Sequence, residues 1–316
     1  MSAPLLTLTL NPAIDQTVTL EHLAPGEVHR ALASRSDAGG KGVNVAGCLA
    51  DWGLPVAVTG ILGADNAAPF AALFAAKGID DRFIRVAGQT RTNLKLLDLQ
   101  SGDTTDVNLP GLSLTAGVFA AARARLLESA GPGSLVVLAG SLPGGLTADT
   151  YADLTRRLKA RGARVVLDAS GPALAAALAA GADALPEVVK PNRHELEEWA
   201  GRPLATRAEV HAGARALSER GIPMVAVSLG AEGALFLCRE GAIHAHAPAV
   251  AVASTVGAGD ALVAGLVAGL HADAALDDRA RLALAFAAGK LTRAGANLPE
   301  RAVVERLAAS VRIERL

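Results

Sequence analysis

The stretch that decides the fold is Ser254-Thr255-Val256-Gly257-Ala258-Gly259-Asp260. It follows a strand-like run over 249–253 and opens an apolar run over 261–270 that is typical of a buried helix. Its glycines allow a tight turn, which leaves the N–H groups of Gly257, Ala258 and Gly259 free at a helix N-terminus. Free donors and the positive end of the helix dipole together predict an anion site.

Asp260 falls in the first turn of this predicted helix. A carboxylate beside an anion site can take the proton of a hydroxyl group that attacks a phosphate. Alternatively, Asp260 only caps the helix and the glycines only make the turn. The stretch alone leaves both readings open.

The composition bounds the class of protein. Of 316 residues, 51% are hydrophobic, which predicts a large core, and 3% are aromatic, so small aliphatic side chains must fill it. A formal net charge of -1 indicates neither a nucleic acid nor a membrane surface as partner. Cys48 and Cys238 lie far apart in the sequence and predict reduced thiols. Without a signal-peptide pattern or a membrane-length apolar run, we expect a soluble cytoplasmic protein.

From residue 115 onward, strands and helices alternate. Short apolar runs at 135–139, 164–168, 188–190 and 225–228 are separated by helical patterns at 116–129, 151–161, 172–180 and 210–220. This order predicts a mostly parallel sheet covered by helices on both faces. Loops that follow the carboxyl ends of its strands are the expected ligand sites.

The strands predicted early in the chain, at 17–21, 28–35, 90–99 and 104–109, are more polar and do not fit that buried sheet, so we expect them to form a small separate β flap. In the run 90–99, Arg91, Asn93 and Lys95 share one face by strand alternation. Two cations and an amide on one face suit a phosphate, although a solvated strand face has the same composition.

A second glycine-rich segment, Ala38-Gly39-Gly40-Lys41-Gly42-Val43-Asn44-Val45-Ala46, precedes a predicted helix that ends near Trp52. Glycine backbone, a lysine and an asparagine at a helix start suit a polyhydroxylated or phosphorylated ligand. The segment is not a Walker A loop, because no Ser or Thr follows Lys41. Among the histidines, His244 and His246 share a strand face without an evident third ligand, which favours structural histidines.

These segments together resemble the ribokinase-like sugar kinases of the PfkB family. The matching pieces, in the family's order, are Asn11-Pro12-Ala13-Ile14-Asp15, Gly39–Ala46, Thr90–Lys95, Gly140-Ser141-Leu142-Pro143, Lys190–Leu196, Ser228–Gly233 and Thr255–Asp260. The resemblance implies one domain over 1–316 with an α/β, ribokinase-like three-layer sandwich, a mostly parallel central sheet and a small β-sheet lid formed by about 13–36 and 90–110. Such lids often pair between subunits in the family, so we expect a homodimer.

The activity that the resemblance implies is transfer of the γ-phosphate of ATP, with Mg²⁺, to a sugar hydroxyl. Asp260 matches the family's catalytic base, and the N–H groups of Gly257, Ala258 and Gly259 would hold the developing charge. The implied substrate-binding residues are Asp15, Gly39, Gly40, Lys41, Asn44, Arg91, Lys95, Asn108 and Ser141. The implied nucleotide-binding residues are Lys190, Asn192, Glu195, Ser228, Gly230, Ala231, Gly233 and Asn297, of which Asn192 and Glu195 would hold Mg²⁺ largely through water.

Alternatives remain open for two of these carboxylates. Glu195 has the position of a helix-start carboxylate that offsets the dipole, and Asp15 after Asn11-Pro12 fits an Asx turn. For the substrate, the pairing of Arg91 with Lys41 or Lys95 favours a sugar phosphate over a neutral sugar.

The expected reaction is phosphorylation of fructose 1-phosphate to fructose 1,6-bisphosphate. Tagatose 6-phosphate and fructose 6-phosphate are the alternative substrates. A non-catalytic sensor of sugar phosphate or nucleotide is the alternative of another class. A nicotinamide dehydrogenase is disfavoured, because no G-x-G-x-x-G follows the first strand.

Overall fold

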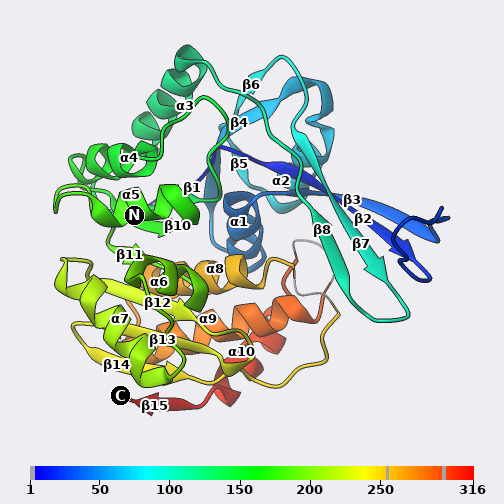
Figure 1. The fold of residues 1–316 in the computed structure, drawn as a ribbon. Coiled ribbons are helices and arrows are strands. Elements are labelled where there is room, and N and C mark those ends of the chain that lie inside the picture. The colour runs from blue at the N-terminus through cyan, green and yellow to red at the C-terminus, as the bar shows by residue number, and fades with distance from the viewer. Residues whose placement is uncertain (1–3, 254–255, 294–296) are drawn as a thin grey trace.

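The computed structural model describes residues 4–253, 256–293 and 297–316. A large sheet lies between two layers of helices, and a small sheet stands beside it (Figure 1). The three-layer α/β sandwich with a small separate sheet, as predicted from the sequence, is therefore confirmed. Among the described residues, no helix combines the length and the apolarity needed to cross a membrane.

The large sheet has eleven strands among the described residues. Its spatial order is β15 (Ile313–Arg315), β14 (Gly241–Ala245), β13 (Ala234–Cys238), β12 (Met224–Ser228), β11 (Val188–Val189), β10 (Arg164–Asp168), β9 (Leu135–Ala139), β1 (Leu5–Thr9), β4 (Val56–Gly63) and β5 (Asp80–Asp81), with β6 (Ile84–Val86) also paired to β4. From β12 to β5 every pairing is parallel, and only β13, β14 and β15 pair antiparallel.

The two helical layers bury opposite faces of this sheet. One layer contains α1 (Lys41–Asp51), α2 (Ala68–Lys77), α8 (Ala258–His271), α9 (Leu276–Leu291) and α10 (Arg301–Ser310). The other contains α3 (Ala116–Ser129), α4 (Thr150–Lys159), α5 (Gly171–Ala179), α6 (Arg193–Ala200) and α7 (Arg207–Glu219). In β9, Leu135 and Val137 pack into the first layer whereas Val136 and Leu138 pack into the second, as strand alternation requires.

The small sheet consists of β3 (Ala33–Gly39), β2 (Ala13–Leu20), β7 (Arg91–Asp98) and β8 (Thr104–Val107), in that order. It projects beyond α1 as a separate blade (Figure 1). Its outer strand β8 is exposed throughout, which explains the polar composition of this part of the sequence. The strands at 17–21 and 28–35 expected from the sequence are shifted in the structure to 13–20 and 33–39.

The segment before α8 differs from the sequence-based expectation. Residues 249–253 form no strand, so the prediction of a strand there is wrong, although the Ala253 N–H donates to the carbonyl of Leu291 at 2.7 Å. Apolar alternation favours a strand, but a strand also needs a neighbouring strand edge, which this segment lacks in the described part of the chain. Ser254 and Thr255 of the motif before α8 lie outside the described residues, as do Gly295 and Ala296, which precede the predicted site residue Asn297.

Candidate active site

Helix α8 begins without a side-chain cap. Its N-cap residue is Gly257, with φ of 78°, and the helix starts at Ala258. Because glycine adopts this left-handed conformation without a steric penalty and has no side-chain acceptor, the first N–H groups of α8 receive no cap from it. Within the described part of the chain no acceptor occupies these donors, so they are available for the anion that the sequence predicts here.

The Asp260 carboxylate, in the first turn of α8, faces helix α1. It is 8% exposed, and Oδ2 accepts a hydrogen bond from Asn44 Nδ2 at 2.7 Å. Among the described residues it accepts no hydrogen bond from the first turn of its own helix, so the alternative that Asp260 serves only as a cap is wrong. Burial and the neighbouring Asp168 raise the pKa of Asp260 to about 6, against the opposing effects of Lys41, Asn44 and Lys190.

Asp168, at the carboxyl end of β10, connects two lysines that the sequence assigned to different ligands. Its Oδ1 lies 3.1 Å from Lys41 Nζ and 3.4 Å from Lys190 Nζ, and Oδ2 is buried without a hydrogen-bond partner among the described residues. The predicted sugar side and nucleotide side thus meet at one carboxylate. We did not single out Asp168 from the sequence, although a carboxylate at the end of a buried apolar strand was a usable signal.

Asp15 lies on β2, where burial raises its pKa, partly offset by Lys95 and by a hydrogen bond from Asn93 Nδ2 at 3.3 Å. A Cβ atom at Gly39 would come within 2.7 Å of Asp15 Oδ2, so glycine is required for the carboxylate to lie against this backbone. Asp15 is therefore a strand residue, and the Asx-turn alternative is wrong. Gly40, with φ of 111°, starts α1 without a side-chain cap.

The two cations of the predicted phosphate clamp are paired within the protein. Arg91 donates to the carbonyl oxygens of Asn11, Pro12 and Leu109 at 3.2–3.3 Å. Lys95 Nζ lies 3.1 Å from Asp106 Oδ1 on the neighbouring strand β8. A phosphate bound here would compete with these partners.

Two other predicted substrate residues are exposed. Ser141 Oγ accepts a hydrogen bond from Asn11 Nδ2 at 3.0 Å, at the end of β9. Asn108 is exposed one residue beyond β8, and no hydrogen bond ties it to the other predicted site residues in the described part of the chain.

On the predicted nucleotide side, α6 begins with a complete capping box. Asn192 Oδ1 accepts from Glu195 N, and Glu195 Oε2 accepts from Asn192 N, each at 2.8 Å. The structural alternative for Glu195 is therefore present in the structure. The predicted role at Mg²⁺ is untested, because these contacts leave other oxygen lone pairs available.

A shallow groove over the start of α6 includes Asn192, Ser228 and Gly230. Ala231 is exposed beside it. Gly233, with φ of 101°, is required by the turn itself, because a Cβ atom would lie 2.0 Å from the carbonyl oxygen of Ala245. Asn297 is exposed and is not among the residues that line the groove.

A pocket lies where the small sheet meets the start of α8. The structure brings together in its wall four residues that the sequence predicts to bind the sugar phosphate or the transferred phosphoryl group: Asp15, Asn44, Lys95 and Gly257. Its other lining residues are Thr17, Arg35, Asp37, Ala38, Val256 and Lys290, none of which is among the site residues predicted from the sequence. The pocket therefore joins elements that are more than 200 residues apart in the chain, such as α1 with Asn44 and the start of α8 with Gly257.

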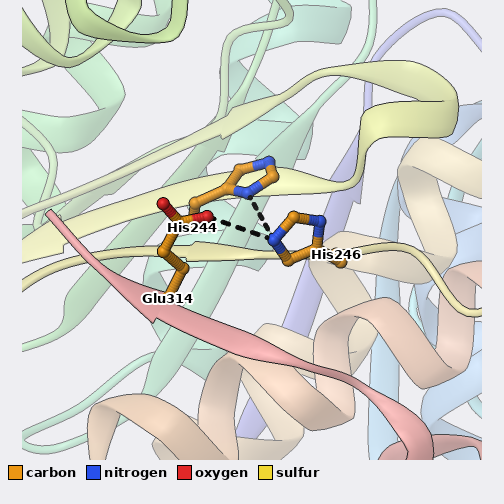
Figure 2. A group of neighbouring side chains, drawn as sticks. All are labelled: His244, His246 and Glu314. Carbon is orange, nitrogen blue, oxygen red and sulfur yellow. Dashed lines mark hydrogen bonds and ion pairs between the residues drawn. The ribbon is translucent and has the colours of Figure 1, made fainter.

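The histidine pair lies away from this pocket, on the β14–β15 edge of the large sheet (Figure 2). Glu314 lies beside His244 and His246, so the expectation that no third potential metal ligand is near is wrong. However, Arg207 bonds Glu314 Oε2 at 3.0 Å and Arg312 bonds His246 Nε2 at 2.9 Å. A divalent cation would have to displace both guanidinium groups, which supports the interpretation of these histidines as part of a structural polar cluster.

The comparisons with known proteins agree with this geometry. Residues 8–302 match the family described as pfkB family carbohydrate kinase. The chain is 54% identical over 292 residues to 1-phosphofructokinase of Xanthomonas campestris, covering 92% of each chain. It is 47% identical to 1-phosphofructokinase of Rhodobacter capsulatus, over 99% of this chain and 97% of that one. Among solved structures, phosphofructokinase-2 from Escherichia coli in complex with substrates and products is similar, with a TM-score of 0.91, 30% identity and coverage of 97% of this chain and 99% of that one.

Proposed function

This chain belongs to the pfkB family of carbohydrate kinases, and from this we propose that it phosphorylates fructose 1-phosphate to fructose 1,6-bisphosphate with ATP and Mg²⁺. The observation that carries the proposal is the Asp260 carboxylate. It is buried at the uncapped start of α8, bonded by Asn44, and has a pKa of about 6. Such a group is ionised at neutral pH and basic enough to accept a proton from an alcohol as the alcohol attacks.

In the proposed step, Asp260 accepts the proton of the C6 hydroxyl while that oxygen forms a bond to the γ-phosphorus of ATP. The bond between this phosphorus and the bridging oxygen to the β-phosphate breaks, and ADP leaves with the bonding electrons. The N–H groups at the start of α8 stabilise the negative charge on the phosphoryl oxygens. Asn44 orients the base through its 2.7 Å hydrogen bond.

For the sugar, Asp15 and Asn44 supply acceptors and a donor for hydroxyl groups, and Gly39 and Gly40 allow close backbone approach. The resident 1-phosphate pairs with Arg91 and Lys95, in competition with their present partners. Lys41 neutralises charge between the two substrates, because it lies beside both Asp168 and Asp260. Ser141 and Asn108 complete the proposed site at its exposed rim.

For the nucleotide, the groove over α6 and its edge supply Ser228, Gly230 and Ala231. Lys190 supplies a buried cation, and Gly233 shapes the turn. Asn297 is the proposed neighbour of the adenine. The residues fit Mg²⁺, since Asp168 Oδ2 is a buried carboxylate oxygen that bonds no other described residue, and Glu195 acts on the same lysine, Lys41. When bound, Mg²⁺ would neutralise phosphate charge, with Asn192 and Glu195 holding it largely through water.

The small sheet is, in this proposal, a lid over the sugar and the contact surface of a homodimer. Val28, Leu32, Leu99 and Val107, in and around its strands, are exposed large hydrophobic residues, with Val28 exposed by 92%. Apolar side chains gathered in one part of a surface favour a protein partner. Light scattering should give twice the mass of one chain, and V28E/L32E should give the monomer; a monomeric parent protein would contradict the dimer.

We also propose a cytoplasmic location, in keeping with the free thiols of Cys48 and Cys238.

The test of the function is ATP consumption with Mg²⁺ across fructose 1-phosphate, fructose 6-phosphate, tagatose 6-phosphate, free fructose and a nucleoside. We expect kcat/KM for fructose 1-phosphate to exceed each of the others by at least about tenfold. A preference for a 6-phosphate would preserve the base and reverse the proposed orientation of the sugar. Absence of turnover with every compound, despite binding of sugar phosphate, would favour a sensor.

A further inference from the structure

Lys290 is a buried cation that the proposed mechanism does not use. It lies in the last turn of α9, preceded by Phe286-Ala287-Ala288-Gly289, and is only 2% exposed. A lysine is seldom buried unless its charge has a partner, because removing an ammonium group from water is costly. The structure contains no hydrogen bond or ion pair from this ammonium group to another described residue.

The side chain reaches the wall of the pocket behind the start of α8. A Cβ atom at Gly257 would lie 3.2 Å from Lys290 Cε, 3.8 Å from Lys290 Nζ and 3.9 Å from Asn44 Nδ2. Lys290 also lines the pocket together with Asp15 and Lys95. The ammonium group is thus held beside the uncapped N–H groups of α8 and beside the residue that bonds Asp260.

The groups around Lys290 offset the cost of burying its positive charge only in part, since its pKa stays below the ordinary value. Burial lowers its pKa, while Cys48, Asp260 and Asp37 act in the opposite direction and Arg35 acts with burial. Cys48 has a pKa of about 12, because of burial, and is neutral at pH 7. Asp37 Oδ2 lies 2.8 Å from Arg35 Nε, so this carboxylate is already paired with a guanidinium group. Among these groups Asp260 is therefore the remaining anion near Lys290, and Lys41 and Lys190 also favour its ionised form.

We infer that Lys290 is a positioning cation of the phosphoryl-transfer centre: its ammonium group keeps Asp260 ionised and adds positive charge to the anion site at the start of α8. The inference rests on the proposed function and assigns a role to a residue outside the motifs that define the site. A fixed charge in a site removed from water acts strongly, because little solvent screens it.

The test is Lys290→Met, which keeps the length of the side chain and removes its charge. We expect kcat to fall by about tenfold, with KM for both substrates changed by less than about threefold. The acidic limb of the kcat/KM profile should move to higher pH, because Asp260 loses a neighbouring positive charge. The melting temperature should not fall, because an unpaired buried charge is removed.

Two further measurements separate this role from a packing role. Lys290→Ala should regain activity when ammonium chloride is added, whereas sodium chloride at the same ionic strength should not restore it. In calorimetry, Lys290→Met should weaken binding of ADP with aluminium fluoride and the sugar phosphate by about tenfold, while binding of ADP alone is unchanged. The control is Lys159→Met, in which the lost ammonium group bonds the carbonyl oxygens of Ala182 and Leu185; its activity and pH profile should match the parent.

An unchanged kcat and an unmoved acidic limb in Lys290→Met would overturn the inference while leaving the proposed function intact. So would a loss of activity in Lys290→Ala that ammonium and sodium chloride restore equally. If instead the parent enzyme phosphorylates no compound of the panel, the proposed function itself fails, and the two failures are distinguished.

Discussion

Helices α6 and α8 both carry an acidic residue at their third position, and the structure uses the two carboxylates in opposite ways. In α6, Asn192 and Glu195 cap each other, so the first N–H groups and the carboxylate satisfy one another. In α8, the cap position is Gly257, and Asp260 bonds Asn44 of another helix. Both carboxylates lie close enough to Lys41 to act on its ammonium group, so distance from the site does not distinguish them.

What distinguishes them is the residue at the cap position. An asparagine satisfies the helix start, which lowers the free energy of the fold and removes donors from any ligand. A glycine leaves the donors free, and the nearby acid is then buried without capping contacts, which raises its pKa. A helix start whose first N–H groups have no cap can bind an anion, and α8, unlike α6, is therefore suited to a reaction.

The largest expected effect is at Asp260. Asp260→Asn should lower kcat by at least about 10²-fold, because the amide cannot accept the proton, while the affinities for ATP and sugar phosphate stay about the same. The melting temperature at pH 7 should not fall, since a buried ionised group with a raised pKa is replaced by a neutral one. Steady-state kinetics measures kcat, and calorimetry measures the affinities and the melting temperature. A near-normal kcat would show that Asp260 is not the base.

The next effect is at the cap glycine. Gly257→Ala should lower kcat by about 10- to 100-fold, because alanine disfavours φ of 78° and its Cβ atom would crowd Lys290, which displaces the N–H donors. Gly78→Ala is the matched control, since Gly78 has φ of 63° at the end of α2 with no atom near its missing Cβ. Equal kcat values in the two variants would contradict a special role for the start of α8.

The pH profile should report the same contrast. With a pKa of about 6, Asp260 is protonated below that value, so kcat/KM should be about tenfold lower at pH 5 than on its plateau. Asn44→Ala removes a hydrogen bond that favours the ionised form, so its acidic limb should move to higher pH. A profile without an acidic limb near pH 6 would argue against Asp260 as the base.

The smallest effect concerns α6. Asn192→Ala should lower the free energy of unfolding by about 1 kcal/mol, because it removes the N-cap of α6. The acidic limb of the kcat/KM profile should stay at the same pH. Denaturant titration measures the first quantity. If KM for MgATP rises as well, Asn192 serves both the helix and the metal; if neither quantity changes, the capping box does not contribute.

The sequence by itself determined the class of fold and most of the candidate site. Alternation of short apolar strands with helices predicted the covered parallel sheet, and Gly257 with Asp260 predicted a helix start that binds an anion. These features are local, because period, turn chemistry and helix starts depend on residues a few positions apart. The strand expected at 249–253 failed for the complementary reason: no neighbouring strand pairs with it in the described part of the chain.

The tertiary structure alone decided which local possibilities are realised. The sequences around Glu195 and Asp260 each allowed a cap or a functional acid, and only the placement of Asn44 against Asp260 separates the two cases. Asp168 and Lys290 become part of the site through contacts across layers, with Lys41 and with Gly257. Burial and the electrostatic field at a side chain are set by neighbours distant in sequence, so these properties were beyond any local pattern.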